Sequence, residues 1–169
     1  MDPARRQQLT DVVAAKAGVD AACAARHLAL HAHDVAAALR SIDLERYTLT
    51  QRLLKKYRRD PEDALQHVAL AIAQQEHIGT DSALRAARIA ALAPPLACVM
   101  LLADWLAYVE WEGFDSALHA NFDAVNALAQ TALGLPPLAR ELAAFELQRP
   151  LLADAVCAHI QRHLAEFPA

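Results

Sequence analysis

Aspartates and prolines recur along this chain where helices would begin, and this pattern of helix-start residues constrains its fold more than any other feature. An aspartate accepts a hydrogen bond from a free amide in the first helical turn, and a proline there leaves no amide unpaired. The aspartates in such positions are Asp20, Asp34, Asp60, Asp81 and Asp115, and the prolines are Pro61, Pro95, Pro137 and Pro150. The segments between them are rich in good helix formers, and the chain has only four glycines. No segment alternates β-branched residues with a period of two, so we predict an all-α protein.

The helix-start residues also predict where the helices lie and how they group. We expect helices near residues 6–16, 21–30, 35–42, 44–59, 62–78, 82–93, 95–111, 116–133, 137–148 and 150–166. We expect a three-helix module over residues 1–43, a linking basic helix over 44–60 and a helical bundle over 61–169. Two segments, from Gly79 and from Gly113, both run from Asp-Ser-Ala-Leu to Pro-Pro-Leu-Ala. They indicate either repeated helical hairpins or a chance recurrence of residues that commonly begin and end helices.

Charge and apolar patterning exclude several classes of protein. The formal net charge of −4 argues against a dedicated nucleic-acid binder, which usually has a basic domain. The longest apolar run, residues 96–109, is broken by Asp104 and is shorter than the about 20 residues that span a bilayer. The first ten residues contain no apolar stretch, so no signal peptide is expected. The three cysteines are widely spaced, which is typical of a reducing compartment, and we expect a cytoplasmic protein.

Residues 9–42 contain three short apolar segments at helical spacing, joined by tight turns at 17–20 and 31–34. This stretch resembles a UBA-like three-helix domain, as found in nascent-polypeptide-associated complex alpha and elongation factor Ts. The positions that match the pattern are Ala17, Gly18, Val19, Ala24, Leu28, Asp34, Val35, Ala38, Leu39 and Ile42. The resemblance covers about a fifth of the chain.

The resemblance implies an interaction module without chemistry of its own. It implies partner contacts at Ala17, Gly18, Val19, Leu39 and Ile42. Ubiquitin-binding relatives have two large side chains in the first turn, which here reads Ala-Gly-Val, so ubiquitin is not the expected partner. The residues after the module also differ from those of elongation factor Ts, so the chain is not that factor.

Four basic residues, Arg52, Lys55, Lys56 and Arg59, recur at helical spacing in the expected helix 44–59. At about 100° per residue they share one face of a helix. Such a stripe suits an acidic protein surface, a nucleic-acid backbone or an anionic membrane, and it is also typical of a solvated helix face. No aromatic residues interleave with it to stack on bases, so nucleic acid is the less favoured partner.

Two histidine pairs, His27 with His31 and His159 with His163, have the i, i+4 spacing that can chelate a metal. A metal site needs three or four ligands, and neither pair has further ligands at a known spacing. We therefore expect no metal and no other cofactor. His33 is expected in a left-handed turn conformation before the helix that Asp34 caps.

Polar and aromatic side chains concentrate between residues 104 and 119. The polar members are Asp104, Tyr108, Glu110, Glu112 and His119. Asp104 lies in an apolar helix, so it either forms a site with these groups or hydrogen-bonds Tyr108 at the surface of an ordinary bundle. Trp105 and Trp111 are expected in the core.

The sequence contains no nucleophile elbow, glycine-rich phosphate loop or HExxH motif. The expected function is therefore protein–protein interaction, as an adaptor or regulatory protein without catalytic activity. One alternative is a small ligand-binding protein or enzyme that uses the Asp104–His119 cluster. The other is a binder of acidic surfaces or nucleic acid through the basic helix.

Overall fold

The computed structural model describes residues 1–169 and contains ten α-helices, one short 3₁₀ helix and no strand. The prediction of an all-α fold is confirmed. The chain divides into two compact units, Met1–Thr48 and Leu49–Ala169, and each has its own apolar core. None of the helices is both long enough and apolar enough to cross a membrane.

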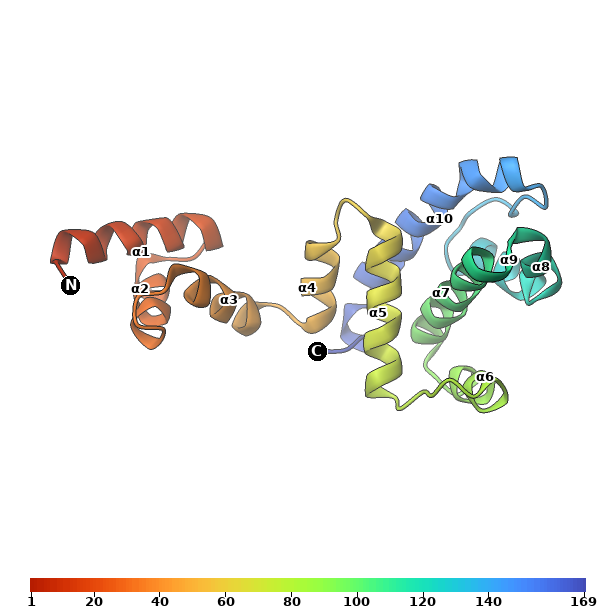
Figure 1. Cartoon of the computed structure of the whole chain (residues 1–169), viewed down its shortest axis with the longest axis horizontal. Helices are drawn as coiled ribbons and strands as arrows, with labels where there is room; N and C mark the ends of the chain where they lie inside the picture. Colours follow the sequence, from red (N-terminus) through yellow and green to blue (C-terminus); the bar gives the residue numbers. More distant parts are fainter. The chain divides into compact units, whose positions relative to one another are not determined.

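The smaller unit is a three-helix fold (Figure 1) built from α1 (Pro3–Ala17), α2 (Ala21–Leu30) and α3 (Val35–Arg46). Its fully buried apolar residues are Val13, Ala24, Leu28, Ala38 and Ile42. The predicted caps are present, since Asp20 accepts from the Cys23 amide at 2.7 Å and Asp34 from the Ala37 amide at 3.0 Å. His33 has φ +66°, the left-handed conformation expected from the sequence.

The larger unit contains seven helices and the 3₁₀ turn, and α7 contacts α5, α6, α8, α9 and α10. Their bounds are α4 (Leu49–Lys56), α5 (Pro61–Gln75), α6 (Ser82–Ala90), α7 (Pro94–Glu112), α8 (Phe114–His119), α9 (Phe122–Thr131), α10 (Leu142–Arg162) and η1 (Leu164–Glu166). α5 contacts α4, α7 and α10, and α10 crosses behind α5 in the view of Figure 1. Asp60 and Asp81 cap α5 and α6 as predicted.

Aromatic side chains and the end of the chain hold this unit together. Trp105 is 3% exposed, contacts three phenylalanine rings and donates a hydrogen bond to the carbonyl of Ala117 at 3.0 Å. Thr50, fully buried at the start of α4, donates its hydroxyl and its amide to the carbonyl of Pro168, at 2.9 and 3.3 Å. Phe167 is buried beside it, so the final residues belong to the core.

Several expected helix boundaries are wrong, each for a local reason. The helix expected over 44–59 does not exist, because α3 continues to Arg46, the backbone is extended at Tyr47, and α4 ends at Lys56. The helix expected over 116–133 is divided in two by Asn121, whose φ is +61°. α10 instead joins two expected helices, because it runs through Pro150.

The two Asp-Ser-Ala-Leu segments fold differently, so they do not form repeated hairpins. Asp81 caps α6, but Asp115 lies within α8, which begins one residue earlier. The first Pro-Pro pair opens α7, whereas the second lies in the irregular segment 134–141. That segment is held by side chains instead of a helix, since Asn126 accepts from the Leu138 amide at 2.8 Å and Gln148 from the Ala139 amide at 2.7 Å.

Candidate interaction surface around Trp111

An open hollow of about 490 Å³ lies on the larger unit where the start of α5, the end of α7 and the middle of α10 meet. We call it the Trp111 hollow. It is lined by Asp60, Glu62, Asp63, Gln66, Ala107, Glu110, Trp111 and Arg149. A second hollow of about 580 Å³ shares Asp60, Glu62 and Arg149 with it and continues along α10 to Asp154.

Local sequence signals place the acidic side of the hollow. Pro61 opens α5, and Asp60 accepts a hydrogen bond from the Asp63 amide at 3.1 Å. Glu62 and Asp63 then fall in the first turn, where the positive end of the helix dipole favours carboxylates. Asp63 is exposed and its carboxylate makes no ion pair with the basic residues of the hollow. The floor is fixed by Gln66, which donates to the carbonyl of Ala103 on α7 at 3.1 Å.

Arg149 lies between three carboxylates at the ridge shared by the two hollows. Its side chain is only 18% exposed, and its Nε donates to Glu62 at 2.8 Å. The same guanidinium also pairs closely with Glu110 on α7 and lies 3.6 Å from Glu146. The hydrogen bond to Glu62 raises the pKa of Arg149 above its ordinary value, although burial acts in the opposite direction. The network therefore ties α5, α7 and α10 together and neutralises part of the acidic surface.

Trp111 lies in the last turn of α7, and its side chain is 85% exposed. The expectation that it fills the core is wrong, whereas the same expectation for Trp105 is confirmed. At about 100° per residue, the six positions between them turn Trp111 well away from the side of α7 that faces the core. Charged neighbours do not separate the two tryptophans, because the buried Trp105 directly follows Asp104.

The polar cluster expected between residues 104 and 119 is not brought together. Asp104 forms a bidentate pair with Arg85 of α6, at 2.7 and 2.6 Å, and shares a hollow of about 300 Å³ with Tyr108. Glu110 lies in the Trp111 hollow instead. Glu112 and His119 are exposed and line neither hollow. α7 directs Asp104 and Glu110 to different hollows, and His119 lies on α8 after the chain turns at Gly113.

The basic residues 52–59 do not form one helical stripe. Arg52, Lys55 and Lys56 lie on α4, but the helix ends at Lys56 and Arg59 follows in the turn before α5. Lys56 lies over the ring of Tyr57, with its Nζ 4.6 Å from the ring centroid. Arg58 and Arg59 line the second hollow. The basic segment therefore lies beside the carboxylates of Asp60 and Glu62, which line the same hollow.

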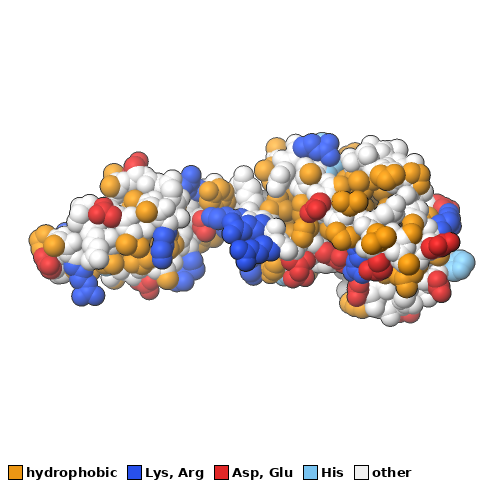
Figure 2. Space-filling view, turned by 90° about the horizontal axis from the view of Figure 1, so that it is seen from above, with side chains coloured by type: hydrophobic (Ala, Val, Ile, Leu, Met, Phe, Trp, Pro, Cys, Tyr) orange, Lys and Arg blue, Asp and Glu red, His pale blue; other side chains and the backbone are white.

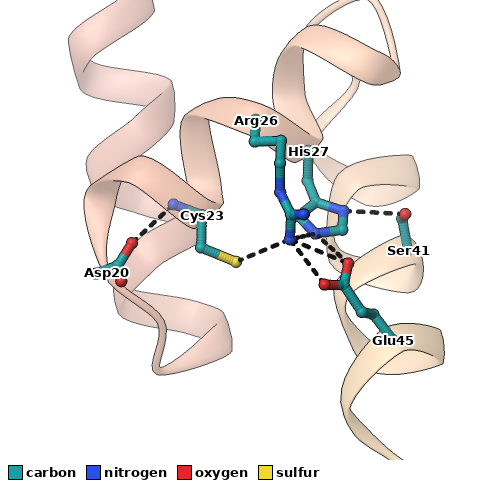
Figure 3. Close-up of polar contacts among 6 residues, drawn as sticks. All are labelled: Asp20, Cys23, Arg26, His27, Ser41 and Glu45. Carbon is teal, nitrogen blue, oxygen red and sulfur yellow. Dashed lines mark hydrogen bonds and ion pairs between the residues drawn. The ribbon is translucent and has the colours of Figure 1, made fainter.

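His27 belongs to a polar network inside the smaller unit rather than to a metal site (Figure 3). It is 2% exposed, and its two ring nitrogens lie 3.0 Å from the hydroxyl of Ser41 and 2.9 Å from the carboxylate of Glu45. Arg26 pairs with the same carboxylate at 2.8 Å, which lowers the pKa of Glu45 below its ordinary value. The network joins α2 to α3, so the buried histidine is structural.

The contact residues implied by the UBA-like resemblance have different environments. Ile42 is 1% exposed and belongs to the core, so it cannot contact a partner. Arg46 donates hydrogen bonds to the carbonyls of Ala17 and Gly18 in the first turn, at 2.8 and 3.2 Å. These carbonyls are therefore already paired within the module. Val19 and Leu39 are partly exposed.

The second histidine pair lies at the end of α10. His159 is buried and neither ring nitrogen has a hydrogen-bond partner, and its ring stacks obliquely on His163 with centroids 4.7 Å apart. No group of three or more potential metal ligands occurs in the structure.

Comparison with known proteins places the larger unit in a family. Residues 48–156 match the family model described as YfbN C-terminal domain. The chain belongs to this family. The YfbN C-terminal domain thus covers α4 to most of α10, including the Trp111 hollow. The chain is also similar to the uncharacterized protein YfbN of Escherichia coli (strain K12), with 35% identity over 144 residues. These residues are 85% of this chain and 60% of that relative, and no solved structure matches the chain.

Proposed function

We propose that this protein acts by binding another protein, as an adaptor or regulatory protein without catalytic activity of its own. The observation that carries the proposal is Trp111, which is 85% exposed at the rim of the acidic Trp111 hollow. Tryptophan is enriched among the residues that dominate protein interfaces, because it buries a large rigid surface at little entropic cost. Solvent exposure of this side chain contributes nothing to the stability of the fold.

Exposed leucines on α10 extend the same proposal. Leu147 and Leu151 are 80% and 60% exposed and lie one turn apart on this helix. Figure 2 shows hydrophobic side chains gathered over one face of the larger unit, with acidic side chains at the margins. An apolar patch rimmed by charges is typical of a protein-binding surface.

The smaller unit supports the same function as a UBA-like module. Its three short helices enclose a small core of their own, as a separate interaction module requires. Because Ile42 is buried, a partner would contact Val19, Leu39 and the exposed Leu44 instead. The first turn has no large side chains, so ubiquitin is not proposed as the partner.

Site-specific photo-cross-linking tests the proposal. Benzoylphenylalanine replaces Trp111 in cells that express the full chain, and the matched control carries it at Leu84, which is 56% exposed on α6. We expect one identified protein to cross-link at position 111 and not at position 84. The purified partner should then bind the full chain, and Trp111→Ala should weaken binding about tenfold or more. Equal cross-linking at both positions, or unchanged binding by Trp111→Ala, would contradict the proposal.

Charge segregation favours a second candidate function, binding of an acidic surface through the basic segment. Residues 49–59 contain five basic residues and no acidic ones. This candidate predicts that the full chain binds RNA with an affinity that falls as salt rises, and that Lys55→Glu with Lys56→Glu abolishes it. RNA binding that is absent, or that the double substitution leaves unchanged, would exclude nucleic acid as the acidic surface.

A further inference from the structure

The larger unit has an uneven charge distribution that selects the chemistry of its partner. Residues 60–169 contain fourteen acidic and five basic residues, and this excess is present in the Trp111 hollow. Four carboxylates and one guanidinium line the hollow, and that guanidinium, Arg149, is already paired with Glu62 and Glu110. Asp63 makes no such pair, and Asp60 caps α5. The hollow therefore carries a net negative charge, which attracts a cation.

Trp111 determines which kind of cation fits. The negative face of an indole ring attracts a cation lying over it, and a planar guanidinium also stacks on the ring. A guanidinium that stacks on Trp111 has donors left for carboxylates, and Asp63 is the unpaired one on the facing wall. Lysine has a compact, strongly hydrated ammonium and cannot stack in this way. Resting on the proposed function, the geometry points to an arginine side chain of the partner protein as the occupant of the Trp111 hollow.

The shape of the surface favours a chain segment over a free small molecule. The Trp111 hollow is open and continues into the second hollow, which adds Glu146 and Asp154 of α10 and also Arg58 and Arg59. A peptide that places one arginine on Trp111 can follow this path with its next residues. The occupant is therefore an arginine-bearing segment of a protein chain.

Fluorescence polarisation of labelled peptides tests this assignment on the full chain. The probe is a fluorescein-labelled peptide of six residues that alternates glycine and arginine, and two matched peptides have lysine or glutamine in place of arginine. We expect the arginine peptide to bind several-fold more tightly than the lysine peptide, and the glutamine peptide not to bind. Binding of the arginine peptide should weaken as salt rises.

Substitutions separate the specific contact from general attraction. Trp111→Ala should weaken binding of the arginine peptide about tenfold, and Trp111→Phe should retain part of it. Asp63→Asn should weaken it several-fold. The matched control Asp115→Asn removes an exposed carboxylate outside the hollow and should change little. Circular dichroism verifies that each variant is folded.

Several results would overturn the inference. Equal binding by Trp111→Ala, or an effect of Asp115→Asn as large as that of Asp63→Asn, would show that only net charge attracts the peptide. A lysine peptide that binds as tightly as the arginine peptide would refute stacking on the indole. If a partner cross-links at position 111 but no arginine peptide binds, the inference falls and the proposed function stands.

Discussion

Replacing Arg149 by methionine tests whether the ion-pair network holds α5, α7 and α10 together. Methionine fills a similar volume without charge, so the change leaves Glu62 and Glu110 facing one another without a cation between them. The Arg149 side chain is 18% exposed, so water replaces the lost contacts only in part. We therefore expect Arg149→Met to lower the free energy of unfolding of the larger unit.

The magnitude lies between two known limits. Two unit charges 4 Å apart attract with about 4 kcal/mol at an effective dielectric constant near 20, and desolvation and side-chain ordering offset much of this. Breaking a fully buried pair costs about 3–5 kcal/mol, whereas an exposed pair contributes about 0–1 kcal/mol. Glu62 is 29% exposed and Glu110 54%, so both are partly solvated. We expect a loss of about 2 kcal/mol.

Urea unfolding followed by tryptophan fluorescence measures the effect, because both tryptophans lie in the larger unit. Glu62→Gln removes one of the opposed carboxylates. The free energy of unfolding of the double variant, Glu62→Gln with Arg149→Met, should therefore be about 1 kcal/mol higher than that of Arg149→Met alone. Arg88→Met, at an exposed position on α6, is the matched control and should change stability by less than about 0.5 kcal/mol. A loss for Arg149→Met no larger than that of the control would refute the reasoning, as would a double variant no more stable than Arg149→Met alone.

Three further predictions concern other buried groups. Burial lowers the pKa of His159, with His163 adding to the effect, so the unfolded chain binds the proton more readily. Urea midpoints of the larger unit should therefore fall as pH decreases below about 6.5, and fall less in His159→Leu. Burial raises the pKa of Cys98 and of Cys157 to about 11, so both thiols should react with Ellman's reagent at pH 8 about two orders of magnitude more slowly in the folded protein than in urea. Ile42→Ala should lower the free energy of unfolding of the smaller unit by about 2–5 kcal/mol and weaken the circular dichroism signal at 222 nm. The urea transition followed by tryptophan fluorescence should not shift, and a shift would contradict separate cores.

Helix starts could be predicted from the sequence because they depend on adjacent residues. Asp20, Asp34, Asp60 and Asp81 each cap the helix that follows. Asp115 fails because Gly113, with φ +86°, already ends α7 and lets α8 begin before the aspartate. Local hydrogen bonding therefore determines these four starts, and a neighbouring glycine is enough to move another.

Helix ends and continuations depended on packing between distant segments. Proline lacks an amide and normally ends a helix, yet α10 continues through Pro150. Its two halves are held by buried side chains on both sides of the proline, including Phe145 and Leu152. Tertiary contacts thus outweigh the local preference, and no pattern within 137–166 indicates this.

The candidate site was mostly hidden from sequence reasoning for the same reason. Glu62 and Arg149 are 87 positions apart, and only the fold brings them together. Glu110 was singled out, but as a partner of Asp104 rather than of Arg149. The exposure of Trp111 follows from its angle on α7, which requires knowing which face of that helix is buried.

The residues around the Trp111 hollow differ in what the fold requires of them, and this difference shows which of them test the proposed function without altering the helix contacts. Arg149 and Glu62 join helices, and Asp60 caps α5, so their conservation or loss would report on stability. Trp111 is exposed and joins no helices, and Asp63 makes no ion pair in the hollow, although the dipole at the start of α5 favours its carboxylate. A large indole ring in water contributes nothing to folding and exposes apolar surface that promotes aggregation. We propose that a partner which covers both residues accounts for the indole beside an unpaired carboxylate.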